Sequence, residues 1–226
     1  MTLAGAIHWT EGLLACALIQ QSLEHLRGVR AERRLFLVRI GLCLLVVFGL
    51  GSPWPLMGLA VLSLFILERF QGPYNGGSDR MGLLALWCLT LSELMPTPAL
   101  REGVFGYLGL QIMLSYLISG WVKVRNRDWR SGRALADVFQ FSAYPVSEDL
   151  RRWADRPRVM AAMSWAVMGF ELGFPLAMAL PVTLMTGLVI AATFHLANAM
   201  LFGLNRFFWT WLAVFPALVW LQGRLF

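Results

Sequence analysis

Residues 116–145, YLISGWVKVRNRDWRSGRALADVFQFSAYP, decide how this chain is organised. The stretch begins in an apolar run, passes the single lysine Lys123, and crosses a basic turn that contains Trp129 and Gly132. It continues into a half-polar segment, after which the chain becomes apolar again. A polar connection between long apolar runs is typical of a protein that crosses a membrane several times.

The composition of the whole chain agrees with this interpretation. Of 226 residues, 58% are hydrophobic and 14% are charged, and the mean hydropathy is +0.63. These values are too apolar for a soluble domain and predict an all-α, polytopic bundle of transmembrane helices in a lipid bilayer. The net charge of +6 does not indicate nucleic-acid binding, because the basic residues lie between the apolar runs, where membrane orientation explains them.

The apolar runs divide the chain into about eight predicted spans within a single integral membrane domain, residues 1–226. The predicted spans are 3–23, 35–52, 54–68, 81–96, 103–123, 159–180, 182–203 and 207–222. With alternating sides, sixteen Lys and Arg residues fall on one side of the membrane and two on the other, while Arg39 lies within a span. The positive-inside rule then predicts that both termini lie outside the cytoplasm.

Two cytoplasmic connections are longer than a turn. Residues 68–80 are rich in turn-forming residues, and their backbone can approach a ligand closely at Gly76 and Gly77. Residues 124–158 contain two predicted interfacial helices, 131–141 and 147–154, separated by Pro145. The first helix would place Leu135, Val138 and Phe139 on one face.

Five ionisable residues fall within or near the spans and are candidates for function: Glu11, Glu93, Lys123, Glu171 and His195. Glu171 stands in the middle of a run between Gly169 and Gly173, which would permit close helix approach, and a buried partner is expected. From its position alone, His195 is better explained as a hydrogen-bonded packing residue, and Lys123 is better explained as an anchor at the membrane surface. In a desolvated site, however, a lysine amine can serve as a base.

No metal site is predicted. The three histidines lack an H-x-x-H spacing, and the three cysteines lie singly in apolar segments, where small buried hydrophobic roles explain them.

Several motifs resemble, in order along the chain, the membrane domain of vitamin K-dependent gamma-carboxylases. More broadly, they resemble the bacterial horizontally transferred transmembrane domain (HTTM) family. The central motif comprises Ser119, Gly120, Lys123, Asp128, Trp129, Gly132 and Leu135. The remaining motifs comprise the loop with Pro73, Tyr74, Asn75, Gly77 and Asp79, then Glu171 with Pro175 and Leu176, and finally Phe194, His195, Leu196 and Gly203. The resemblance extends from about residue 68 to the C-terminus.

The resemblance implies a bacterial inner (cytoplasmic) membrane protein whose Lys123 is the base that starts chemistry at a bound quinone or hydroquinone. It assigns catalytic roles to Lys123, His195 and Glu171, and cofactor-binding roles to Tyr74, Asn75, Asp79, Trp129 and Gly132. The carboxylases also carry a large non-membrane region that binds peptide, which these 226 residues lack. Carboxylation of a protein substrate is therefore expected to require a separate peptide-binding partner.

Two functions follow as alternatives. The first is a quinone-linked membrane oxidoreductase or peptide-modifying enzyme that uses Lys123 as a base. The second is a non-catalytic subunit that packs against other membrane proteins, lipid, quinone or pigment, with ten Trp and fifteen Phe supplying contact surface. Transport through a Glu171 and His195 proton relay ranks last, because no internal repeat is evident.

Overall fold

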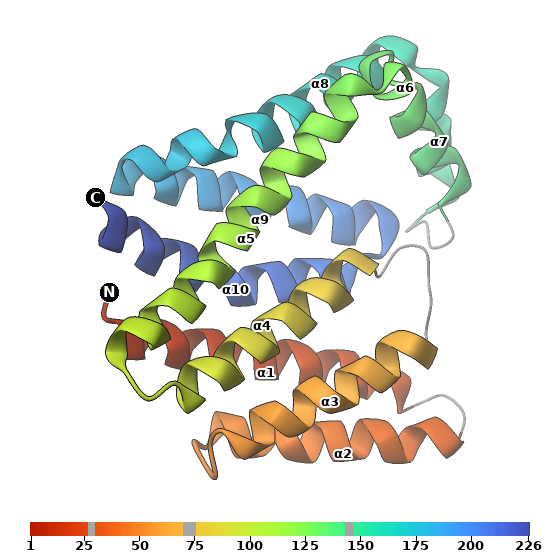
Figure 1. The fold of residues 1–226 in the computed structure, drawn as a ribbon. Helices are drawn as coiled ribbons and strands as arrows, with labels where there is room; N and C mark the ends of the chain where they lie inside the picture. Colours follow the sequence, from red (N-terminus) through yellow and green to blue (C-terminus); the bar gives the residue numbers. More distant parts are fainter. Residues whose placement is uncertain (27–29, 70–75, 143–146) are drawn as a thin grey trace. The chain divides into compact units, whose positions relative to one another are not determined.

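The computed structural model describes residues 1–26, 30–69, 76–142 and 147–226 (Figure 1). Throughout these ranges the chain is helical, with connecting turns and no strand. The predicted all-α class is therefore confirmed.

Within these ranges helices occupy all or most of each of the eight predicted apolar stretches. The elements are α1 Leu3–His25, α2 Arg30–Val47, α3 Trp54–Arg69, α4 Gly76–Leu94, α5 Pro98–Arg125, α6 Arg127–Arg130, α7 Arg133–Phe141, the 3-10 helix η1 Glu148–Asp155, α8 Pro157–Gly173, the 3-10 helix η2 Phe174–Ala179, α9 Pro181–Phe202 and α10 Asn205–Leu225. The second stretch is helical only as far as Val47, and the sixth is divided between α8 and η2. Among the described residues, three helical segments are long and apolar enough to cross a membrane: Pro98–Arg125, Pro157–Ala179 and Pro181–Phe202. The total of about eight spans stays a prediction.

Proline and glycine set several of the helix boundaries. Pro98, Pro157 and Pro181 are the first residues of α5, α8 and α9. Proline suits the first turn of a helix, because its fixed φ is helical and its missing N–H has no partner there. Gly203 ends α9 with a φ of +70°, a conformation that glycine adopts without the penalty of a Cβ atom.

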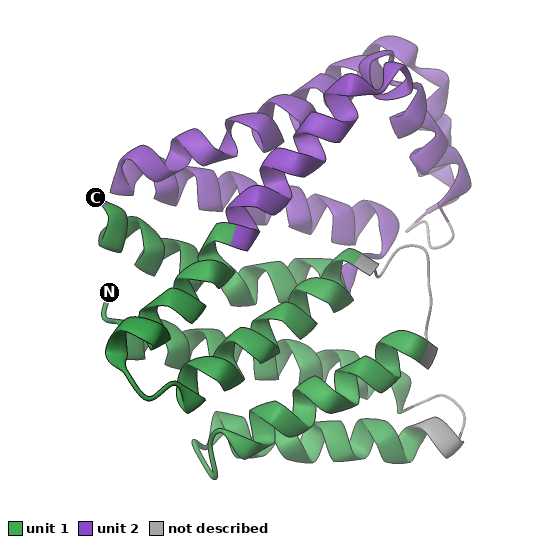
Figure 2. Ribbon diagram, in the orientation of Figure 1, with its two compact units in different colours: residues 1–110, 206–225 green, residues 111–205, 226 purple. Residues whose placement is uncertain are grey.

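The chain divides into two compact units (Figure 2). Unit 1 comprises residues 1–110 and 206–225, and unit 2 comprises residues 111–205 together with residue 226. The first part of α5 therefore belongs to unit 1 and the remainder to unit 2. Within unit 1, a Cβ added at Gly109 would lie 3.0 Å from the carbonyl oxygen of Ala217, so this glycine lets α5 and α10 approach closely.

In unit 2, the connection after α5 folds onto the long helices. Leu135 and Phe139 of α7 are buried with Met160 of α8 and Phe202 of α9, and Val138 packs against this cluster. The predicted apolar face of α7 is thus real, and it is covered by protein. The second predicted segment forms the 3-10 helix η1, and Pro145 lies outside the described residues. The location of both segments at a membrane surface stays a prediction.

Many large apolar side chains remain exposed on the helices. Exposed residues on the long apolar segments include Ile118, Trp121, Val122, Trp165, Leu176, Val182, Val189 and Met200. Extensive apolar surface of this kind is unfavourable in water and is the surface that lipid chains cover. The exposed surface and the apolar helices together indicate an integral membrane protein.

Candidate functional site

One face of α5 carries the polar residues of the candidate site. Tyr116, Ser119 and Lys123 are three to four residues apart, so they line the same side of the helix, and Gly120 lies between them. A Cβ added at Gly120 would lie 2.8 Å from the backbone nitrogen of Leu172 and 2.9 Å from Cβ of Glu171. Only glycine therefore allows α8 to come close enough for Glu171 to meet this face.

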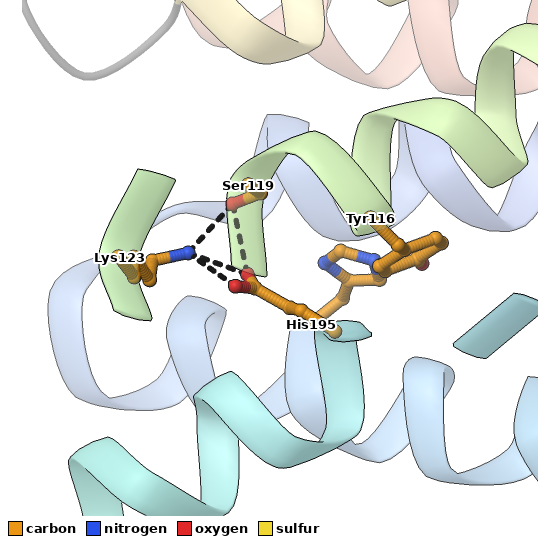
Figure 3. Close-up of polar contacts among 5 residues, drawn as sticks. Tyr116, Ser119, Lys123 and His195 are labelled. Carbon is orange, nitrogen blue, oxygen red and sulfur yellow. Dashed lines mark hydrogen bonds and ion pairs between the residues drawn. The ribbon is translucent and has the colours of Figure 1, made fainter. Parts of the chain in front are cut away.

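Lys123, Ser119 and Glu171 form a closed set of hydrogen bonds (Figure 3). Nζ of Lys123 lies 2.5 Å and 2.6 Å from the two carboxylate oxygens of Glu171, and it donates to Oγ of Ser119 at 2.6 Å. Ser119 donates in turn to Oε1 of Glu171 at 3.0 Å. The side chain of Lys123 is 16% exposed and that of Glu171 only 4%. The predicted buried partner of Glu171 is thus Lys123.

His195 of α9 joins the same face of α5 through Tyr116. The Tyr116 hydroxyl and Nε2 of His195 are hydrogen-bonded at 2.7 Å, and both side chains are buried. Because Tyr116 lies on the same face of α5 as Ser119 and Lys123, this hydrogen bond places His195 beside that face. Its catalytic role stays a prediction.

Aromatic rings surround the Tyr116–His195 pair. The ring of Tyr116 lies 4.2 Å from the ring of Phe174 and 5.5 Å, edge to face, from that of Phe170. Phe194 contacts both Phe170 and His195. Such ring contacts are geometrically specific, so they hold the orientation of Tyr116 and His195 within an apolar surrounding.

The basic turn after α5 is fixed against α8. The ring of Trp129 lies 5.2 Å from Nζ of Lys123, within the range of a cation–π interaction. The carbonyl oxygen of Trp129 accepts a 2.5 Å hydrogen bond from Oγ of Ser164. Gly132 has a φ of +81°, and a Cβ there would lie 2.4 Å from the backbone nitrogen of Ala161. Trp129 therefore borders the site. Gly132 does not contact Lys123 in the described interactions, but it allows the turn to pack closely against the backbone of α8.

The remaining predicted site residues lie either in unit 1 or outside the described residues. Asp79 belongs to unit 1, where its Oδ1 accepts a 3.4 Å hydrogen bond from Nε2 of Gln21. Tyr74 and Asn75 lie outside the described residues. Their assignment to cofactor binding stays a prediction.

The sequence-based prediction assigned no site role to Tyr116 or Ser119, although Ser119 belongs to the central motif and both lie at helical spacing from Lys123. It was also wrong about which glycine permits close helix approach. A Cβ added at Gly169 or Gly173 would meet nothing within 4 Å, whereas one at Gly120 would clash with backbone.

Gly169 and Gly173 instead line an open recess on unit 2 with a volume of about 380 Å³. Its walls come from α8, η2 and α9 and include Phe170 and Phe174, the same two rings that contact Tyr116. A mostly apolar hollow that shares walls with a polar cluster is a usual arrangement for a small-molecule site. Among the residues that the structure describes, no group of three or more metal-ligating side chains gathers there or elsewhere.

The arrangement can hold and move one proton. A buried ion pair with contacts this short keeps charge inside the helices because each partner compensates the other. If the proton of the Lys123 ammonium moves to a carboxylate oxygen of Glu171, both groups become neutral and the amine gains a lone pair that can accept another proton. Ser119 is placed to hydrogen-bond either form, because a hydroxyl can donate and accept.

Comparison with known families gives one finding. The sequence matches the HTTM domain over residues 104–221. The matched range includes Tyr116, Ser119, Lys123, Glu171 and His195, so it contains the whole cluster. Searches of curated proteins and of solved structures found no match.

Proposed function

The chain belongs to the HTTM domain family, the membrane domain family of vitamin K-dependent gamma-carboxylase, and on this basis we propose that it is a quinone-linked membrane enzyme whose base is Lys123. The observation that carries the proposal is the contact of Nζ of Lys123 with both carboxylate oxygens of the buried Glu171. A general base must be able to give up its proton and remain positioned. Glu171 is the group to which Lys123 can pass that proton without releasing a charge into the apolar surroundings.

The other residues of the site have distinct roles in this proposal. Ser119 orients Nζ of Lys123, and Trp129 closes the side of the ammonium toward the basic turn. His195, hydrogen-bonded to Tyr116, provides a second proton-carrying group at the same site. Catalytic roles for Lys123, Glu171 and His195 rest on this geometry and on the family.

A quinone or hydroquinone is the cofactor that the family implies, and the residues present fit such a group. Phe170 and Phe174 line the recess of about 380 Å³ with apolar rings, and both contact the buried ring of Tyr116. A bound hydroquinone would supply reducing equivalents and an acidic hydroxyl. Lys123 would accept a proton from that hydroxyl, and the aromatic residues would exclude water from the site.

The proposed topology is one membrane domain of about eight spans in the bacterial inner membrane, with both termini outside the cytoplasm. The helices found over all eight apolar stretches of the described chain support the span count, and the distribution of basic residues supports the orientation.

The direct test is oxidation of a short-chain hydroquinone by dioxygen with the purified protein in lipid nanodiscs. Wild-type protein should accelerate the reaction, and Lys123→Ala should lower the rate by about 100-fold or more, the usual contribution of a positioned general base. Arg125→Ala is the matched control, since Arg125 is an exposed cation two residues further along α5. Equal rates for wild type and Lys123→Ala would refute the role of Lys123.

A non-catalytic packing role is the second candidate, favoured by how completely Lys123 is satisfied. Its ammonium already donates to three oxygens, as expected of a structural ion pair. The double variant Lys123→Met with Glu171→Leu discriminates the two roles, because apolar replacement of a buried pair is often tolerated by the fold. A packing protein should stay folded and keep its biological role in this variant. An enzyme should stay folded and lose turnover.

A further inference from the structure

A second buried cation lies in unit 1, where neither the proposed base nor its partners are found. Arg39 of α2 is 4% exposed and lines a small pocket of about 10 Å³, whose walls are partly polar and partly apolar. Within the described part of the chain, its Nε and Nη1 have no hydrogen-bond partner. Oγ of Ser63, which lines the same pocket, has none either. Buried polar groups in native proteins are nearly always satisfied, so this pocket is incomplete without a ligand.

The chemistry of these unsatisfied groups defines the ligand. A guanidinium can only donate hydrogen bonds, and a serine hydroxyl is able to donate. Arg39 and Ser63 together therefore present donors to the pocket, and the group that satisfies them must be an acceptor.

The charges around Arg39 indicate that this acceptor is an anion. Asp79 lines the same pocket, yet it does not form an ion pair with Arg39 among the described contacts. Oδ1 of Asp79 accepts from Gln21 instead. The buried guanidinium of Arg39 therefore has no carboxylate in contact with it in the described part of the chain, and burying an uncompensated charge in an apolar bundle is unfavourable.

We propose that this pocket binds a single halide ion, held by Arg39 and Ser63, because its volume of about 10 Å³ admits one small spherical group and no larger anion. The polar lining of the pocket consists of Gln21, Arg39, Ser63, Ser78, Asp79 and Thr210. Asp79, which the family resemblance assigned to a quinone, here limits the pocket to one negative charge. The anion site is independent of Lys123 and of the proposed reaction.

Binding of the anion stabilises unit 1. The pocket-lining residues come from α1, α2, α3, α4 and α10, so a ligand that contacts them links five helices of the unit. A ligand that binds only the folded state raises the free energy of unfolding. Once the ligand concentration exceeds the dissociation constant, this increase grows with the logarithm of the concentration. The anion therefore acts as a structural ligand of this half of the chain.

The test is thermal unfolding of the purified protein, followed by the fluorescence of its ten tryptophans. Sodium chloride replaces sodium gluconate stepwise at constant ionic strength, and a parallel series uses sodium acetate. The midpoint should rise by several degrees and then saturate with chloride, whereas acetate, which is too large for the pocket, should have no saturable effect. Saturation with acetate equal to that with chloride would contradict a site of this size. No dependence on the anion, or a linear dependence without saturation, would mean that only water or general screening acts there and would overturn the proposal.

Variants test whether the anion-dependent shift of the unfolding midpoint arises at the Arg39 pocket. Arg39→Gln should lose the saturable shift, whereas Arg34→Gln, an exposed arginine on the same helix, should retain it. Asp79→Asn provides a measurement that does not depend on whether Arg39→Gln folds. Removal of its negative charge should lower the half-saturating anion concentration severalfold. A saturable shift that is unchanged in Asp79→Asn would contradict the proposed location.

Discussion

Unit 1 and unit 2 each contain a cation buried among apolar helices, and the two units treat that cation differently. In unit 2, Lys123 contacts both oxygens of Glu171 and the hydroxyl of Ser119. In unit 1, Arg39 has a carboxylate within electrostatic range but leaves two of its nitrogens without a partner. The paired cation lies inside the residues that match the HTTM domain, and the other precedes them.

These two cations illustrate two ways of stabilising a buried charge in a membrane protein. The Lys123–Glu171 pair is complete within the chain, so its ability to react comes from proton movement inside the pair. The Arg39 pocket is incomplete within the chain, so its completion requires something bound. Substitutions at equivalent places in the two units should therefore have unequal effects.

The largest expected difference comes from removing each carboxylate. Glu171→Gln leaves the Lys123 ammonium without its counter-ion and should lower the free energy of unfolding by about 3 kcal/mol, since breaking a buried pair on one side is costly. Asp79→Asn removes a carboxylate that is not in contact with Arg39 and should change the free energy by less than about 1 kcal/mol. Reversible unfolding in mixed micelles, with gluconate as the only anion, measures both. Equal losses would remove the distinction between the two units.

The second difference concerns packing at a glycine beside each cation. Gly120→Ala places a methyl group against the backbone of α8 and should destabilise the protein by about 1–3 kcal/mol, because the helices must separate. Gly82→Ala, beside Arg39, would meet only Cγ2 of Thr210 at 3.7 Å, an ordinary contact. It should be neutral or stabilising by up to about 1 kcal/mol, through helix propensity.

Gly103→Ala is the control for Gly120→Ala on the same helix. A Cβ at Gly103 has open space around it, so this variant should behave as Gly82→Ala does. If Gly120→Ala proved as stable as Gly103→Ala, the close approach of α5 and α8 would be wrong, and with it the reach of Glu171 to Lys123.

The smallest difference comes from the two serines. Ser119→Ala removes hydrogen bonds to Lys123 and Glu171 and should cost about 1 kcal/mol. Ser63→Ala removes a hydroxyl that has no partner in the described structure, so in gluconate the free energy of unfolding should hardly change. The same unfolding measurement compares them, and a larger loss for Ser63→Ala would show that its hydroxyl has a partner within the protein.

Much of the fold could be predicted from the sequence. The apolar runs located the long helices, because a helix that contacts lipid must be apolar over its length. Their ends were less predictable: α5 begins at Pro98, five residues before the predicted start at residue 103, because it includes the charged residues Arg101 and Glu102, which hydropathy excludes. Hydropathy also could not distinguish an α-helix from the 3-10 helix over Glu148–Asp155, since both bury one side of a short segment.

The candidate site was predictable in part. The family motif identified Lys123, Glu171 and His195, which the structure brings to one site. It did not identify Tyr116 and Ser119 as their partners, because pairing depends on which helices adjoin, and that is absent from a list of spans. From the sequence, Arg39 could be recognised only as a cation inside a span. That two of its nitrogens have no hydrogen-bond partner depends on which side chains surround it in the folded unit.

Mass spectrometry of everything that stays bound to the protein after extraction in mild detergent would test whether this chain is a quinone-linked enzyme. We expect wild-type protein to retain a quinone without a fixed complement of other proteins. We also expect Lys123→Ala, which leaves the aromatic walls in place, to retain the quinone while losing turnover. Retention of other membrane proteins in fixed stoichiometry, with no quinone in any preparation, would refute the enzyme proposal and identify the helices as a structural subunit.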